Sequence, residues 1–297
     1  MSQHVAPGRA ALSILAGMAT LGLSDNLVPF VTQDGSLWQF HLLRSVVALA
    51  IMVPIAAMGH GIIWPKRPVA VLARSAIQAT SMLIYFGCLA ILPIGVVVAG
   101  LFTSPLFVAL IAGVFQGKRV GPLHLIAILA GFVGALMVIR PNPAALDLVA
   151  FLPVFAGLLY AIGAVATRAW CEGEGTLSLS AGFFVMLGVM GAAGCIIFPG
   201  VGEGADGFVS RGWMTLSADL IFWIVVQAFG ALIGIGLLFR GYQIGEASNV
   251  AVFEYSLLVF ASGWAWYLWG QGVPLFGLFG MGFIVISGAL IAWRRSP

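Results

Sequence analysis

The chain has 297 residues, of which 61% are hydrophobic and only 8% are charged, and its mean hydropathy is +1.10. So few polar side chains cannot coat a water-soluble globule, whereas a helix in lipid satisfies its own backbone groups and needs no polar coat. The net charge of +3 would suggest an anionic partner in a soluble protein, but here the placement of charge says more than its sum, and we expect the lipid bilayer, not nucleic acid, as the surrounding partner.

Ten apolar stretches follow one another along the chain, and a spanning helix needs about 20 mostly apolar residues. The sequence therefore predicts an all-α integral membrane protein with ten transmembrane helices and no soluble domain. The first stretch is expected to be a retained helix, because nine more follow it. The expected spans are residues 10–30, 37–58, 69–91, 95–115, 121–139, 148–168, 178–198, 218–239, 247–269 and 275–293.

The positive charges favour one face of the membrane. If the N-terminus is cytoplasmic, alternate connections are cytoplasmic too, and they hold ten of the thirteen cations, whereas the outer connections hold only Arg140 and Arg211. The positive-inside rule then predicts that both termini are cytoplasmic. The cations assigned to the cytoplasmic side are Arg9, Lys66, Arg67, Arg74, Lys118, Arg119, Arg168, Arg240, Arg294 and Arg295.

Two ionisable residues inside the first pair of predicted spans are candidates for a functional site, because a charge at membrane depth is costly. Asp25 and Arg44 fall at similar depth, roughly 10 Å below the outer boundary at about 1.5 Å per residue. We expect an ion pair between these neighbouring antiparallel helices. It either only holds the two helices together or contacts a solute.

Glu254 is the third intramembrane ionisable residue, and it falls near mid-bilayer in the ninth predicted span, close to Asn249 and Tyr255. No cation in a span is an evident partner at that depth. Such a carboxylate either takes up a proton or faces a water-filled cavity, and both suit a proton-coupling or cation-binding site. The alternative is a neutral Glu254 that hydrogen-bonds a neighbouring helix.

Other polar residues at membrane depth are weaker candidates, because each is also explained by an interhelical hydrogen bond. Those included as substrate or coupling-ion candidates are Gln78, Tyr85, Thr103, Tyr160 and Gln227.

Pro105 is expected to interrupt the fourth span beside Thr103, since proline removes a backbone donor. The three cysteines and four histidines show no metal-site spacing, and no phosphate-binding loop or nucleophile elbow is present. We therefore expect no catalytic residue, no metal and no cofactor.

The two halves of the chain end alike. Residues Gly134–Arg140 (GALMVIR) resemble Gly288–Arg294 (GALIAWR), and Ile94-Gly95 in the first half matches Ile244-Gly245 in the second. We predict two five-helix repeats, residues 1–146 and 147–297; because five is odd, the second is inverted relative to the first. Chance similarity between apolar strings is the alternative.

Thirty-nine glycines, with small-residue spacings such as Gly230 with Gly234 and Gly188 with Gly191, favour close helix packing. This packing occurs either inside one bundle or between the protomers of a homodimer.

Short motifs in order along the chain resemble the drug/metabolite transporter superfamily, in its ten-helix EamA-type branch. They are Asp25-Asn26, Trp38-Gln39-Phe40-His41-Leu42-Leu43-Arg44, Phe115-Gln116-Gly117-Lys118-Arg119-Val120 and Trp269-Gly270-Gln271-Gly272-Val273-Pro274. The resemblance covers essentially the whole chain. It implies an inner-membrane carrier, often an exporter, that works by alternating access, with a cavity lined by the first, third, fourth, sixth, eighth and ninth helices.

The chain departs from the family where members often carry a Glu after the fourth and ninth helices, since Lys118 and Gln271 stand there. Any role that the family gives to those carboxylates therefore does not carry over to Lys118 and Gln271.

We therefore expect a secondary active transporter of a small organic metabolite or drug-like solute. The main alternative is a membrane-embedded enzyme that acts on a lipid-borne substrate, which would need two converging acid, base or metal groups. A non-transporting sensor or assembly factor is a third reading, and it lacks a recognisable output domain.

Overall fold

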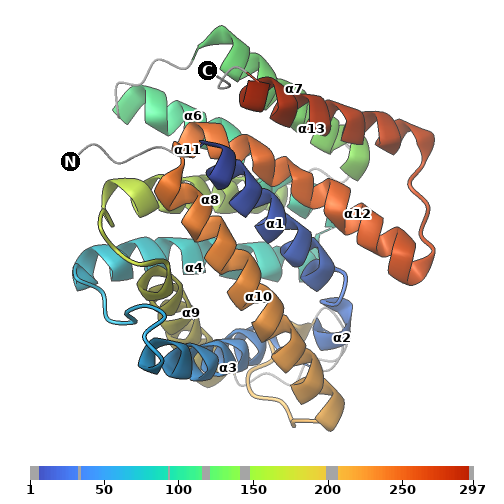
Figure 1. Cartoon of the computed structure of the whole chain (residues 1–297). Helices are drawn as coiled ribbons and strands as arrows, with labels where there is room; N and C mark the ends of the chain where they lie inside the picture. The colour runs from blue at the N-terminus through green and yellow to red at the C-terminus, as the bar shows by residue number, and fades with distance from the viewer. Residues whose placement is uncertain are drawn as a thin grey trace.

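The computed structural model describes residues 7–32, 35–92, 94–115, 121–140, 148–198 and 207–293, and within these ranges its regular structure is helical, with no strand (Figure 1). The helices in chain order are α1 (Pro7–Asp25), α2 (Pro29–Thr32), α3 (Leu37–Ala57), α4 (Pro68–Ile91), α5 (Ile94–Leu101), α6 (Ser104–Phe115), α7 (Pro122–Ile139), α8 (Phe151–Ala169), α9 (Thr176–Ile197), α10 (Ala218–Ile244), α11 (Ala247–Val250), α12 (Ser256–Trp269) and α13 (Leu275–Trp293). Two short 3-10 segments are η2 (Leu148–Ala150) and η4 (Ala251–Tyr255).

Helix starts follow the local sequence. Ser36 caps α3, where its hydroxyl accepts a hydrogen bond from the Gln39 backbone N–H at 3.1 Å, and Ser217 caps α10 by accepting from the Leu220 N–H at 3.1 Å. Prolines open α4 and α7, where a missing backbone donor costs little because the first N–H groups of a helix have no partner within it.

In the described part of the chain, eight segments are long and apolar enough to cross a membrane, and Leu275–Ile291 forms a shorter apolar helix. The chain is therefore a multi-pass membrane protein. The eight segments are Gly8–Val31, Leu37–Ala57, Pro68–Leu89, Val96–Val114, Pro122–Ile139, Leu148–Ala169, Thr176–Ile197 and Ala218–Ile244.

The ninth predicted span, residues 247–269, is not one continuous helix. It forms α11, then η4, then α12, and the Ser256 hydroxyl donates to the Phe253 carbonyl at 2.6 Å within the tightened turn. The fourth predicted span is also divided. α5 ends at Leu101 and α6 begins at Ser104, directly before Pro105, which confirms the predicted interruption.

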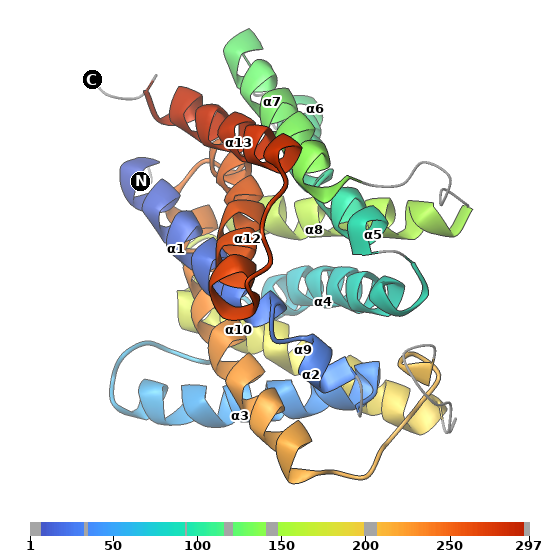
Figure 2. The same ribbon diagram turned by 90° about the vertical axis from the view of Figure 1, so that its right-hand side faces the viewer.

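Four pairs of helices form the largest packing contacts: α1 with α10, α3 with α9, α4 with α8, and α7 with α13. Each pair joins a helix before residue 141 to one after residue 147, so the two halves are interlocked (Figures 1 and 2). Glycines allow this approach. A Cβ on Gly134 of α7 would lie 2.6 Å from the Gly280 carbonyl oxygen of α13, and a Cβ on Gly191 of α9 would lie 2.7 Å from the Trp38 carbonyl oxygen of α3.

The start of α1 and the end of α13 lie on the same side of the molecule (Figures 1 and 2). Two of the helices, α7 and α13, pack together at the edge of the bundle, while α1, α4, α8 and α10 lie nearer its centre. Lys118, Arg119, Arg294 and Arg295, which the orientation argument uses, lie outside the described residues.

Candidate functional site

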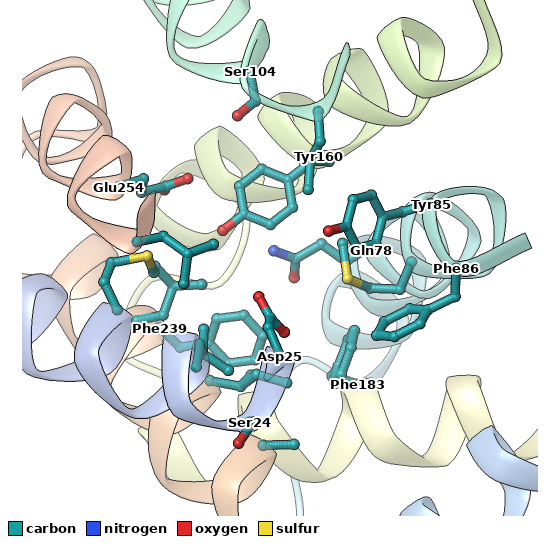
Figure 3. A pocket seen from close by; sticks show the side chains of 18 of the residues that line it. Ser24, Asp25, Gln78, Tyr85, Phe86, Ser104, Tyr160, Phe183, Phe239 and Glu254 are labelled. Carbon is teal, nitrogen blue, oxygen red and sulfur yellow. The ribbon is translucent and has the colours of Figure 1, made fainter. Parts of the chain in front are cut away.

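A cavity lies among the central helices and encloses about 950 Å³, including the part that opens to solvent. It is lined by α1, α4, α5, α6, α8, α10 and the interrupted segment η4–α12, and also by α3 and α9, through Arg44 and Phe183. Its volume falls in the usual range for small-molecule sites, roughly 300–1,000 Å³. The cavity thus lies where helices of both halves meet (Figure 3).

Most of the predicted site residues come together in this cavity. Asp25, Arg44, Gln78, Tyr85, Tyr160, Gln227 and Glu254 all line it. They come from six different elements, so the fold gathers side chains that are up to about 230 positions apart in the sequence.

Three predicted residues do not line the cavity. The Thr103 hydroxyl donates to the Gly100 carbonyl at 2.6 Å in the break between α5 and α6, and the Asn249 amide donates to the Glu246 carboxylate at 2.6 Å. Tyr255 is fully buried and its ring stacks on Phe102 with centroids 5.8 Å apart. These residues shape the two helix interruptions.

Glu254 lies in η4, and its carboxylate is buried, with the side chain only 5% exposed. The Tyr242 hydroxyl, from the last turns of α10, donates a hydrogen bond to Glu254 Oε1. Within the described residues Glu254 forms no salt bridge. A carboxylate that is buried, has no cationic partner and contacts a cavity can exchange a proton with water or a solute there.

The structure does not form the predicted ion pair between Asp25 and Arg44 as a direct salt bridge, although the two charges attract each other across the cavity. Both side chains line the cavity, but they form no salt bridge; Asp25 is exposed, whereas Arg44 is buried. The Arg44 guanidinium instead lies over the rings of Phe40 and Phe86, with Cζ 4.7 and 5.6 Å from their centroids, and Nη2 lies 3.2 Å from His41 Nδ1. Aromatic faces attract a cation electrostatically, and this contact orients Arg44 in place of the carboxylate.

Amide side chains fix the helices around Asp25. Gln227 of α10 donates to the Ser24 carbonyl at 2.7 Å, which ties α10 to the turn of α1 that carries Asp25. Gln78 of α4 is buried, and its Oε1 has no partner among the described residues. In Figure 3 the Asp25 carboxylate, the Gln78 amide and the Tyr160 hydroxyl all point toward the middle of the cavity.

Sequence reasoning missed several contributors. The aromatic rings of Phe86, Phe102, Phe183 and Phe239 line the cavity, but apolar residues in an apolar span carry no signal that separates lining from lipid contact. Tyr242 was missed because the predicted eighth span ends at residue 239, whereas α10 continues to Ile244. Ser24 also lines the cavity, and its polarity at membrane depth was a signal that could have found it.

Arg74 needs a second correction, because the orientation argument assigns it to the cytoplasmic connections. It lies in α4, and its side chain is fully buried. Its position inside the predicted span 69–91 was the signal that should have placed it among the intramembrane charges.

Among the described residues, no group of three or more His, Cys, Asp or Glu side chains could hold a metal ion.

Residues 8–140 match the model of the EamA-like transporter family. This segment, less than half of the chain, is what resembles the family. The matched segment includes five cavity-lining helices, α1, α3, α4, α5 and α6, and ends directly after α7.

Two relatives of this chain are named riboflavin transporters. One, from Rhizobium johnstonii, is 32% identical over 56% of this chain and 57% of its own length. The other, from Brucella anthropi, is 30% identical over 61% of each chain. The chain therefore aligns with less than two thirds of each of these relatives. A pseudopaline exporter from Pseudomonas aeruginosa is 26% identical over 76% of this chain and 74% of its own.

The fold of this chain also matches a solved crystal structure. The match covers 99% of this chain and 100% of the solved one, with a TM-score of 0.76 and 18% sequence identity. At this identity the likeness concerns the fold alone.

Proposed function

We propose that this protein is a secondary active transporter that carries a small organic solute across the inner membrane by alternating access. The proposal rests on one observation above all: a cavity between the two halves of a multi-pass membrane protein that holds two acidic side chains, Asp25 and Glu254. Intramembrane ionisable residues that face a cavity are typical of substrate and ion pathways. The transporter names of the relatives support the same conclusion.

The helix packing supports two inverted repeats, residues 1–146 and 147–297. Exchanging the halves turns α1 into α8, α4 into α10, α3 into α9 and α7 into α13. Under this exchange the pair α1 with α10 becomes α8 with α4, and the pairs α3 with α9 and α7 with α13 map onto themselves. A pseudo-two-fold axis produces this pattern, and the two repeats then supply the two gates of alternating access.

The interrupted helices support the repeat independently. The break between α5 and α6 and the break at η4 follow the matching Ile94-Gly95 and Ile244-Gly245 pairs, one in each half. Both breaks border the cavity, through Phe102, Ser104 and Glu254. Discontinuous helices at corresponding positions of two repeats are a common feature of transporter binding sites.

The lining favours a solute with a planar aromatic body and several hydrogen-bonding groups. Aromatic rings of Tyr85, Phe86, Tyr160, Phe183 and Phe239 supply flat apolar faces, which stack on planar rings. The amides of Gln78 and Gln227 and the two carboxylates supply donors and acceptors. Riboflavin, with a tricyclic ring and a hydroxylated chain, has this chemistry and is the first solute to test.

Glu254 is our candidate for proton coupling. Its carboxylate has a hydrogen-bond donor in Tyr242, contacts the cavity, and has no cationic partner in the described part of the chain. Such a group can bind a proton on one side of the membrane and release it on the other as the cavity changes its exposure.

We place both termini in the cytoplasm. The cation asymmetry and the common side of the ends of α1 and α13 support this orientation.

The experiment is uptake of riboflavin into proteoliposomes that contain the purified full-length chain. We expect accumulation that exceeds the rate in empty liposomes, increases with an imposed proton gradient and collapses when a protonophore is added. A panel of planar heteroaromatic solutes and polycarboxylates tests the solute class. The absence of protein-dependent uptake or exchange for every solute of the panel would contradict the proposal.

A further inference from the structure

A second pocket lies beyond the central cavity, at the ends of α8 and α10. It encloses about 620 Å³, including open solvent, and its lining is largely polar: Thr167, Arg168, Glu172, Arg240 and Gln243 are among its residues. In the proposed orientation these helix ends face the cytoplasm. The pocket and the central cavity share no lining residue, although α8 and α10 contribute to both.

Arg74 lies between the two spaces and contacts a wall residue of each. Its Cζ lies 3.8 Å from the ring centroid of Phe239, which lines the central cavity. Its Nε donates to the Thr167 hydroxyl at 2.8 Å, and Thr167 lines the polar pocket. Arg74 is fully buried and lines neither space itself. The guanidinium therefore occupies the partition between them.

The contacts of Arg74 are few for a buried charge. The Thr167 hydroxyl donates a hydrogen bond to the Gly163 carbonyl at 2.8 Å, and its oxygen therefore has a lone pair free to accept from Arg74. Arg74 Nη1 donates to the Leu179 carbonyl at 3.4 Å. Nη2 has no hydrogen-bond partner, and Arg74 forms no salt bridge within the described residues. A cation held by a ring face and a hydroxyl is easier to release than one in a buried ion pair, whose loss is strongly destabilising.

We propose that the polar pocket is the vestibule of the transport pathway and that Arg74, Phe239 and Thr167 form the gate that separates it from the central cavity. This inference rests on the proposed transport function. When α4 separates from α8 and α10, the guanidinium loses both contacts at once, and the two spaces join. The closed and open states then form a two-state equilibrium that the solute shifts by binding one state more tightly.

The experiment measures access to the central cavity from the vestibule side. Cys88, Cys171 and Cys195 are first replaced by alanine, and Ala231, which lines the cavity on α10, becomes the single reporter through Ala231→Cys. Sealed vesicles of both orientations are treated with a charged, membrane-impermeant maleimide, and the labelling rate is recorded. A second reporter, Arg240→Cys, shows on which face of the membrane the vestibule opens, because Arg240 lines the vestibule and is exposed.

Phe239→Leu removes the ring under the guanidinium but keeps the charge. We expect it to raise vestibule-side labelling of Ala231→Cys about tenfold, since a desolvated cation–π contact is lost only from the closed state. Thr167→Val keeps the side-chain shape and removes the acceptor, and it should raise the same rate to a smaller extent. Phe222→Leu is the matched control, because Phe222 lies on the same helix but is 59% exposed and outside the cavity. It should leave the rate unchanged.

The outcomes separate the gate from the proposed function. Unchanged labelling in both Phe239→Leu and Thr167→Val, or an equal rise in Phe222→Leu, overturns the gate. If Arg240→Cys reacts only from the outer face, the proposed orientation is wrong. The gate is then tested by labelling Ala231→Cys from the outer face, with the same expected changes in rate. Because the readout is chemical access, a failure to find transport leaves this test intact.

Discussion

At the scale of single residues, the cavity sets two carboxylates in different surroundings. Asp25 is exposed and stands where α1 ends, whereas Glu254 is buried in a 3-10 segment and bonded by Tyr242. Two similar groups with different access to water are suited to different tasks. We assign proton exchange to Glu254 and leave Asp25 as the group that a solute meets directly.

Glu254→Gln tests the coupling role. The amide keeps the shape and the capacity to accept from Tyr242 but cannot change protonation. We expect the variant to fold normally, to lose gradient-driven accumulation in proteoliposomes, and to retain exchange of solute between the two sides. Concentrative, pH-dependent uptake at the wild-type level would remove Glu254 from the mechanism and make Asp25 the next candidate. Tyr242→Phe is the companion variant, which removes only the hydrogen bond.

Arg44 provides a second test at this scale, a pair of double-mutant cycles on thermal unfolding in detergent. Because the guanidinium lies over Phe40 and forms no salt bridge with Asp25, the cycle Phe40→Leu with Arg44→Gln should show coupling of about 1 kcal/mol. The cycle Asp25→Asn with Arg44→Gln should show less. A larger coupling with Asp25 would restore the ion pair as the main partner of Arg44.

The sequence could predict the polar part of the site, because polar groups at membrane depth are rare and costly. Gln78, Tyr160 and Glu254 were found for that reason, and they meet in one cavity. The partners of the charges could not be predicted. The rings that hold Arg44 and Arg74 come from apolar positions, and equal predicted depth did not show that Arg44 lies against Phe40.

At the scale of elements, glycine-mediated contact between helices is the main packing device. A Cβ on Gly280 would lie 2.6 Å from the Gly134 carbonyl oxygen and 2.8 Å from Met137 Cβ, so α13 and α7 touch backbone to backbone there. Span positions could be predicted from apolar runs. The division of the ninth span at η4 could not, since no proline marks it, and it depends on how its residues pack around Tyr255 and Glu254.

Gly280→Ala tests this packing, with Gly282→Ala as its control on the same helix. The first adds a methyl group where backbone atoms must move, so we expect a loss of about 1–3 kcal/mol in the free energy of unfolding and a lower midpoint of thermal unfolding. Nothing lies within 4 Å of a Cβ on Gly282, so that change should be neutral or slightly stabilising, by up to about 1 kcal/mol. Equal effects of the two variants would show that the contact between α7 and α13 is looser in solution.

At the scale of the whole molecule, the orientation in the membrane decides to which face the cavity and the vestibule open. Reporter fusions at Pro297 and within residues 203–210 test it. We expect a cytoplasmic signal from the first and a periplasmic signal from the second, because cations gather on one side of the predicted spans. A periplasmic signal from the fusion at Pro297 would invert the topology and exchange the roles of the vestibule and the outer end of the cavity.

The buried position of Arg74 also constrains how the chain is made. Its described contacts, Thr167, Leu179 and Phe239, all belong to the second half. While the ribosome has synthesised only the first half, the charge of α4 has none of them, and a lone arginine in lipid is poorly tolerated. We therefore infer that α4 settles late, after α8, α9 and α10 have been inserted, and that a product truncated after residue 146 is cleared by proteases rather than accumulating as a stable half-protein.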